Sequence, residues 1–252
     1  TLEAIRNHNC GWFYRACGND FSQIPGSPIA YWAGERVFET FTKFPKISDL
    51  AKPMIGMRTG DNERFLRLWF EVPSETFGTG FEDASGAKLS GQKWFPYNKG
   101  GEFRKWYGNN EFVLNWAENG YEVKSATLEK YPQLDWDNLG WKISNEKNFF
   151  LPSVTWTATS SSYFGVRTSP AGYIFDVKGS SCFPKEANRM LVLANLASKP
   201  TREVLKMLNP TIEFQPRDIG NVPHVLPEDT PAAAVVRDNL VPTLVNHSRS
   251  DW

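Results

Sequence analysis

Turn signals between residues 93 and 120 limit most strongly what this chain can fold into. Glycine and asparagine cluster at 99–101, 108–110 and 119–120, and short runs rich in aromatic and branched side chains lie between them. Runs bounded by such turns are typical of short antiparallel strands. We therefore predict strands over 93–97, 103–107 and 111–116.

A second β-rich block and several helices complete the predicted pattern. Residues 152–183 are expected to form further strands, with hairpin turns near 160–162 and 170–172. Pro28 precedes apolar residues at helical spacing, which predicts a helix over 28–44. Further predictions are a strand over 65–72, a loop over 74–92, and helices over 185–197 and 201–208. Together these elements predict a mixed α+β fold, an antiparallel, hairpin-rich domain with flanking helices.

The expected organisation has three parts: an N-terminal connecting segment (1–45), a main domain (46–223) and a proline-punctuated C-terminal linker (224–252). The chain has 28 Lys and Arg against 28 Asp and Glu. This balance excludes a uniformly cationic coat but allows a local basic groove. No apolar run is long enough to predict a membrane span, and three cysteines without a signal-peptide pattern favour a reducing cytoplasm.

Motifs for catalysis are weak in this sequence. The chain has only three histidines and no G-x-S-x-G motif, and the spacing of His8, Cys10 and Cys17 is not that of a usual zinc site. A poor helix sequence follows the glycine-rich string 77–81, so a flexible loop is predicted there rather than a nucleotide-binding turn. Carboxylates among tryptophans leave a carbohydrate-binding or glycosidase domain open. We predict no catalytic and no metal-binding residue.

Two clusters combine the residue types that nucleic-acid binding needs. The first is the glycine turn over 58–64, in which two arginines flank polar side chains. The second, 93–105, alternates lysine and arginine with aromatic residues. Cations on turns can contact phosphates, while arginine and asparagine can read base edges in a major groove. The residues alone fit equally well a role in capping and solubilising hairpins.

These clusters lie inside motifs that resemble the adenine-specific DNA methyltransferase family PglX of BREX phage-defence systems. The similar segments, in order along the chain, are IPGSPIAYW (24–32), GMRTGDNERF (56–65), WFPYNKGG (94–101), RKWYGN (104–109), FGVR (164–167), GYIFD (172–176), GSSCF (179–183), LNPTI (208–212) and DIGNVP (218–223). The resemblance therefore extends over most of the chain in the order expected for the family.

The resemblance implies an enzyme that transfers a methyl group from S-adenosylmethionine to adenine N6 in a restriction-modification-like system. Such enzymes use an Asn/Asp-Pro-Pro-Tyr/Phe motif and a glycine-rich cofactor loop, and this chain has no Pro-Pro dipeptide. The resemblance thus implies that 46–223 is a target-recognition domain for duplex DNA that binds no cofactor itself. An N-terminal methyltransferase domain outside this chain is the expected partner and binds S-adenosylmethionine. We expect both ends of the chain to be cut from a longer protein.

The resemblance supports a set of DNA-binding residues without assigning each role. Lys99, Arg104 and Lys105 are predicted to contact phosphate, whereas Asn62 and Asp61 either face a base or bond their own turn. The glycines of the set are expected to supply backbone freedom. The full predicted set is Arg58, Thr59, Gly60, Asp61, Asn62, Arg64, Lys99, Gly100, Gly101, Arg104, Lys105, Ser160 and Arg167. The alternative is a protein-interaction module that binds other defence-system subunits or a phage-encoded DNA mimic.

Overall fold

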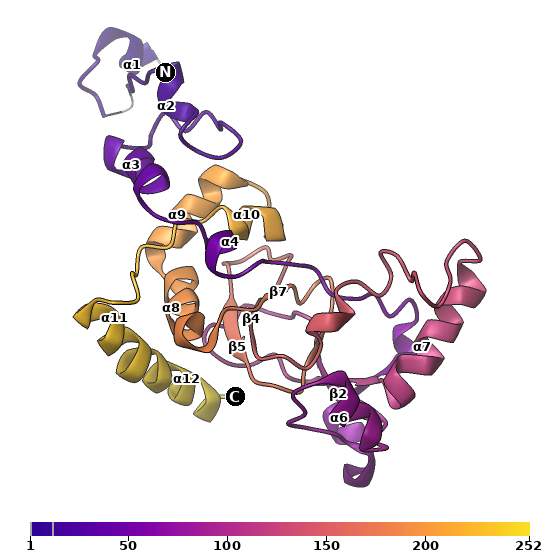
Figure 1. Ribbon diagram of the computed structural model, residues 1–252. Helices are drawn as coiled ribbons and strands as arrows, with labels where there is room; N and C mark the ends of the chain where they lie inside the picture. Colours follow the sequence, from indigo (N-terminus) through magenta and orange to yellow (C-terminus); the bar gives the residue numbers. More distant parts are fainter. Residues whose placement is uncertain (1, 12) are drawn as a thin grey trace.

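Two small β-sheets form the centre of the molecule, and helices lie around them (Figure 1). The computed structural model describes residues 2–11 and 13–252. The strands are β1 (Leu66–Leu68), β2 (Trp94–Asn98), β3 (Phe112–Asn115), β4 (Ser153–Trp156), β5 (Val166–Ser169), β6 (Ile174–Phe175) and β7 (Ser181–Cys182). The predicted α+β class is confirmed.

The pairing of the strands determines which loops meet. The four-stranded sheet has the order β1-β3-β2-β6, with antiparallel pairing of β3 to both β1 and β2. The strands β2 and β6 are parallel, and Asn98 lies opposite Phe175. Because parallel strands end at the same edge of a sheet, the next residues, Lys99 and Asp176, emerge side by side. The other sheet, β5-β4-β7, is antiparallel throughout.

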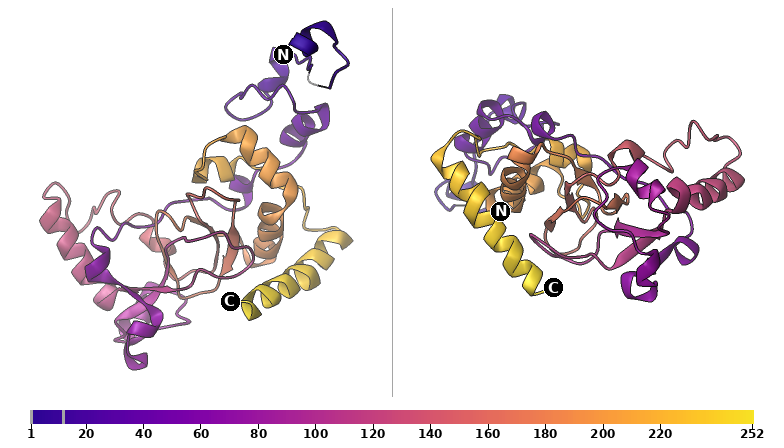
Figure 2. Two further views of the ribbon diagram at one scale, coloured as in Figure 1. Left: turned by 180° about the vertical axis from the view of Figure 1, so that it is seen from behind. Right: turned by 60° about the horizontal axis from the view of Figure 1, so that its bottom comes forward.

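Helices of very different length surround the sheets. They are α1 (Leu2–Arg6), α2 (Gly18–Phe21), α3 (Glu35–Lys43), α4 (Ile47–Leu50), α5 (Asn62–Phe65), α6 (Ala84–Leu89), α7 (Ala117–Lys130), α8 (Glu186–Ala197), α9 (Lys199–Leu208), α10 (Pro216–Gly220), α11 (Pro231–Val235) and α12 (Val241–Ser250). Tighter or wider turns are η1 (Trp69–Glu71), η2 (Ser74–Thr76), η3 (Glu146–Asn148) and the π turn η4 (Val236–Leu240). In the described part of the chain, no helix combines the length and apolar character needed to cross a bilayer. The two views of Figure 2 place α7 and α12 at opposite ends of the molecule.

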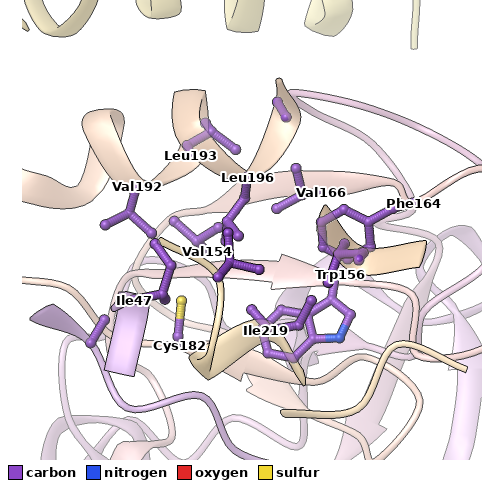
Figure 3. Packing of buried hydrophobic residues seen from close by; sticks show 14 of the residues in the cluster. Ile47, Val154, Trp156, Phe164, Val166, Cys182, Val192, Leu193, Leu196 and Ile219 are labelled. Atoms are coloured by element: carbon purple, nitrogen blue, oxygen red, sulfur yellow. The ribbon is translucent and has the colours of Figure 1, made fainter. Parts of the chain in front are cut away.

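The first apolar core lies between the three-stranded sheet and α8. Figure 3 shows Leu193 and Leu196 directed from α8 towards Val154 and Val166 of the sheet. Trp156, at the end of β4, is completely buried in this cluster. Val192, Leu193, Leu196 and Ala197 therefore form the face of α8 that covers the sheet.

Two further cores lie under the other elements. One joins the four-stranded sheet to α7 and to the aromatic pair Phe149 and Phe150. A smaller one joins α3 to α9, where Phe38 and Phe41 pack near Met207. The N-terminal helix α3 is thus attached to the main body through α9.

The helix predicted over 28–44 is shorter in the structure. Helix α3 begins at Glu35, because Gly34 before it is extended and 28–33 forms tight turns instead. Ile29 and Trp32, expected on the apolar face, are 72% and 50% exposed. The apolar stripe predicted after Pro28 is therefore helical only within α3, where Val37 and Phe41 face a core.

Three predictions between residues 65 and 107 were also wrong in detail. The predicted strand 65–72 contains only the three residues of β1, between α5 and η1. The predicted loop 74–92 contains α6, which begins because the Asp83 carboxylate accepts from the Gly86 amide. No strand forms over 103–107, since Trp106 has φ +72° and makes one isolated bridge to Arg167.

The C-terminal segment is helical, although it was expected to be a linker. Residues 231–250 form one helical stretch, α11 to α12, through the π turn. Val241 is fully buried in the first core, and the Ser248 hydroxyl donates to the carbonyl oxygens of Lys105 and Tyr107.

Helix α9 also begins earlier than predicted, with Pro200 inside its first turn, where proline is tolerated.

Cys182 provides a direct test of the first core. It is fully buried, and burial raises the pKa of its thiol to about 12. Because the thiolate is the nucleophile, Cys182 should not react with an alkylating reagent near neutral pH, whereas the exposed Cys17 should. Mass spectrometry after native alkylation should therefore find Cys182 unmodified, and unfolding in urea should make it reactive. Modification of the native protein at Cys182 would contradict this packing.

Candidate nucleic-acid interface

The loop 58–64 is held by its own polar side chains. Gly60 has φ +74°, and Asp61 caps the short helix α5 by accepting from the Arg64 amide at 3.0 Å. The Thr59 hydroxyl donates to the Asn62 side-chain oxygen. Asp61 therefore has the turn-bonding role that was one of its two expected roles, and the loop reaches solvent in a fixed shape.

Lys99 connects this loop to the sheet. Its ammonium lies 2.8 Å from an oxygen of the buried Asp176 and 3.4 Å from the Asn62 oxygen. The Tyr97 hydroxyl donates to the same Asp176 oxygen at 2.7 Å. Burial, with the nearby Asp176 charge, raises the pKa of Tyr97 well above its usual value. Lys99, predicted to contact phosphate, thus already has a carboxylate partner, and its side chain is 24% exposed.

The glycine turn after Lys99 is tightly packed. Gly100 and Gly101 have φ +86° and +132°, conformations that favour glycine. A Cβ on Gly100 would lie 2.7 Å from the Lys178 carbonyl oxygen, so 99–101 rests directly on 177–179. The predicted need for backbone freedom at Gly60, Gly100 and Gly101 is confirmed.

Two adjoining hollows open beside these turns. One, of about 280 Å³, is lined by residues including Arg58, Thr159 and Lys178. The other, of about 550 Å³, lies between 101–103 and 159–162, and Thr159 lines both. We call the surface formed by Arg58, Lys99, Gly101, Ser160 and Lys178 the central face.

Two of the three cations of the central face, Arg58 and Lys178, have no carboxylate partner among the described residues. Arg58 donates to the Trp141 carbonyl oxygen at 2.8 Å and lies over the Trp141 ring, and Lys178 donates to the Thr159 hydroxyl at 2.9 Å. No carboxylate of the described chain lies within ion-pair distance of either, although Glu213 and Glu102 line the hollows. Hydroxyl groups of 159–162 add neutral donors.

Arg104 and Lys105 face other parts of the molecule. The Arg104 guanidinium lies 3.6 Å from Asp251 and over the Trp252 ring. The Lys105 ammonium donates to the Ala197 carbonyl oxygen at 2.6 Å, and burial, followed by the charges of Arg202 and Lys199, lowers its pKa. The structure therefore separates these two cations from the contacts that join Lys99 to the loop 58–64.

Arg167 lies in the interior, where DNA cannot reach its guanidinium in this conformation. It is 2% exposed, and its Nε has no hydrogen-bond partner among the described residues. Burial lowers the pKa of Arg167 to about 10, opposed by the charge of Glu111.

Lys178 was missed by the sequence analysis, although a signal existed. It lies in 176–179, directly after a predicted hairpin strand and before Gly179. A Cβ on Gly179 would lie 2.0 Å from the Asn98 carbonyl oxygen, which explains why glycine follows Lys178. A cation beside an obligatory glycine is the pattern that drew attention to 58–64, and it could have been found here.

Gly78 in the glycine-rich string 77–81 is closely packed, whereas a Cβ on Gly80 would meet no atom within 4 Å. A Cβ on Gly78 would lie 2.8 Å from the Phe95 ring, so the backbone is pressed against the second core. Among residues 2–11 and 13–252, no three His, Cys, Asp or Glu side chains cluster as metal ligands would. His8 instead stacks on Phe13.

Comparison with known proteins identifies homologues of this chain. No protein-family model matches the chain. The chain is 35% identical over 254 residues to the adenine-specific methyltransferase PglX of Lacticaseibacillus casei (strain Zhang), a match that includes 100% of this chain and 20% of the relative. The chain is homologous to the PglX and BrxX methyltransferases. For BrxX of Escherichia coli O9:H4 (strain HS), the identity is 32% over 256 residues, with 98% of this chain and 18% of the relative matched.

The chain thus spans about a fifth of the length of these curated relatives. The matches run through the loop 58–64, the turn 99–101 and the segment 159–162 alike, because they include practically the whole chain. The resemblance noted from short motifs therefore extends over all elements of the central face.

Proposed function

We propose that this chain recognises duplex DNA for an adenine-specific methyltransferase of a BREX phage-defence system. The central face is the proposed contact surface, with Arg58 and Lys178 on phosphates and the loop 58–64 directed at a groove. Phosphate contacts position a protein on DNA, while side chains on a fixed turn can reach base edges. Bacterial DNA as the target implies that the protein works in the cytoplasm.

The observation that carries the proposal is the convergence of three distant segments. Loop 58–64, turn 99–101 and segment 159–162 meet around two hollows, with Lys99 bonded to Asn62 and Gly100 packed on Lys178. Fixed loops on a rigid scaffold are the usual place for recognition residues. These turns are polar and contain glycine, and Arg58 and Lys178 beside them have no carboxylate partner among the described residues. Such a surface fits a phosphate backbone better than it fits an apolar partner.

The methyl-transfer chemistry belongs, in this proposal, to a part of the protein outside this chain. The relatives are named adenine-specific methyltransferases, and this chain covers a fifth of each. Methylation of adenine N6 inside a duplex requires that the base leave the stack, and a separate recognition surface holds the rest of the site. S-adenosylmethionine and a catalytic domain are therefore the implied cofactor and partner.

Removal of the two cations of the central face should weaken duplex binding and its salt dependence. In the double variant Arg58→Gln/Lys178→Gln, the log-log slope of affinity against salt should fall by about two, since each phosphate contact contributes about 0.9. Fluorescence anisotropy with a labelled duplex, over about 50–200 mM salt, measures the slope.

The control replaces two exposed lysines that line neither hollow of the central face, Lys88→Gln/Lys147→Gln, and should leave the slope unchanged. Arg104→Gln/Lys105→Gln tests the assignment made from sequence. A slope reduced by one to two units in that variant alone would move the phosphate contacts away from the central face. Absence of any duplex binding by the native chain would end the proposal.

One observation supports a second function, the binding of another protein. Tyr14, Tyr31 and Trp32 are each about half exposed, and the Tyr31 ring contacts the other two edge to edge. Exposed aromatic groups of this kind are enriched in protein interfaces. Absence of duplex binding together with salt-insensitive capture of a defence-system subunit would favour this function over DNA recognition.

A further inference from the structure

A third hollow lies on the other side of the loop 58–64. It has a volume of about 440 Å³ and is bounded by residues 59–65, by the end of α7 at 126–131, and by Lys142. Because Arg58 lines the hollow described above and Gly60 lines this one, the loop is a ridge between the two. None of the residues predicted from sequence beyond this loop lines it.

Lys142 is the unusual residue of this hollow. Its residue surface is 6% exposed, and its ammonium lies 4.1 Å from the Tyr131 ring centroid and 4.0 Å from that of Trp141. No carboxylate of the described chain is within ion-pair distance. Buried lysines are normally paired with a carboxylate, whereas this ammonium has two aromatic rings beside it, which attract its charge but do not neutralise it. A hydrogen bond with Lys142 also lowers the pKa of Tyr131.

Other cations reinforce the positive charge around Lys142. Arg58 lies over the same Trp141 ring at 5.1 Å, so one indole contacts two cations. Arg64 and Lys130 line the hollow and lack ion-pair partners in the described part of the chain. The carboxylates there are Asp61, which caps α5, and Glu129, which is exposed. Three cations thus line this hollow against two carboxylates.

We propose that this hollow binds a phosphate group, with the Lys142 ammonium as its central contact and Arg64 and Lys130 at its rim. A phosphate supplies the negative charge and the several acceptor oxygens that such a set of donors requires. A phosphate of the DNA backbone is the source that the position beside the ridge favours, and this part rests on the proposed function. A phosphate carried by another molecule is the other source.

The test compares Lys142→Gln with Lys142→Arg and with the exposed control Lys147→Gln, in two arms. In the first arm, inorganic phosphate is titrated at constant ionic strength, and its stabilisation of the protein is followed by thermal unfolding. In the second arm, a labelled duplex is titrated at several salt concentrations. Lys142→Gln should lose the phosphate-induced stabilisation, weaken duplex binding roughly three- to tenfold, and lower the salt slope by about one. Lys142→Arg should retain most of both effects.

The outcomes separate this site from the proposed function. Loss of phosphate stabilisation with unchanged duplex binding supports a phosphate site served by another molecule. If Lys142→Gln keeps both the phosphate-induced stabilisation and the duplex binding of the native chain, the proposed phosphate site is wrong, even where the native chain binds duplex. Failure of the native chain to bind duplex ends the proposed function, and the phosphate arm then decides the site alone. Should Lys142→Gln fail to fold, the rim variant Arg64→Gln/Lys130→Gln, with both residues exposed, gives the same readouts.

Discussion

Asp176→Ala is expected to lower the free energy of unfolding by about 3 kcal/mol and to remove most duplex binding. Asp176 is 1% exposed and accepts from three donors: the Tyr97 hydroxyl, the Lys99 ammonium and the Lys178 amide. Removal of one partner from a buried ion pair costs about 3–5 kcal/mol, because the remaining groups lose their compensation. Lys99 is partly exposed, so the lower end of this range applies here.

The loss of binding follows from the position of Asp176 between two segments of the central face. Lys99 contacts Asn62 of the loop 58–64, and Asp176 holds both Lys99 and the amide of Lys178. Without the carboxylate, the Lys99 ammonium has no fixed position, and the turns on either side lose their common support. Conformational freedom of these turns must then be lost again when DNA binds, which lowers affinity.

Urea unfolding and fluorescence anisotropy measure the two effects. The matched control is Asp137→Ala, an exposed aspartate whose loss should change stability by no more than about 0.5 kcal/mol. A stability loss with unchanged duplex binding would show that Asp176 supports the fold but not the central face. Stability within about 1 kcal/mol of the native chain would contradict the buried pair itself.

The alkaline limit of stability provides a related check on Tyr97. The pKa of its phenol is raised in the folded protein, so folding favours the protonated form. Its contribution is present below the usual tyrosine pKa of about 10 and is lost as pH rises through the higher folded value. The native chain should therefore lose stability above about pH 10.

The sequence predicted best those features that depend on local chemistry. Strands over 93–97 and 111–116 correspond to β2 and β3, because turn residues bound both runs closely. The glycines at 60, 100 and 101 were assigned to special backbone positions, and all three have positive φ. These residues are restricted by their own turn, so the information lies within a few positions of each.

Features that depend on tertiary contacts could not be predicted in this way. Ile29 and Trp32 have helical spacing, yet the helix begins only after the extended Gly34, and both side chains remain exposed. Arg104 and Lys105 lie among aromatic residues as in a basic strand, but Arg104 pairs with Asp251, just after α12, and Lys105 donates to the last residue of α8. The sequence does not show that residues near 250 return to this place.

The same limit explains which site residues were missed. Lys142 and Lys178 come from segments that only the fold brings to the loop 58–64. The parallel pairing of β2 with β6 places the ends of these two strands together, and this brings Lys178 to the turn after β2. Hydrophobic patterns predict that strands exist but give no order across a sheet, and the candidate face depends on that order.

Trp156→Ala is expected to lower the free energy of unfolding by about 3–5 kcal/mol. The side chain is 0% exposed in the first core, where Figure 3 shows it beside Ile219 and Phe164. Its truncation removes buried apolar surface and leaves a cavity that α8 and the sheet cannot close. The Phe214 carbonyl, which accepts from the Trp156 indole at 2.8 Å, also loses its donor. Urea unfolding of the native and variant chains measures the difference.

Two further variants separate the cavity from the hydrogen bond. Trp156→Phe keeps an aromatic ring but not the donor, and it should cost about 1–3 kcal/mol, the penalty of an unpaired carbonyl with a smaller cavity. Trp136→Ala removes an indole that is 52% exposed and stacked on Tyr121, and it should change stability by less than about 1 kcal/mol. Equal effects of Trp156→Ala and Trp136→Ala would contradict the burial of Trp156. Because β4 leads directly into 159–162, a large effect at Trp156 with weakened duplex binding would also show that this core supports the central face.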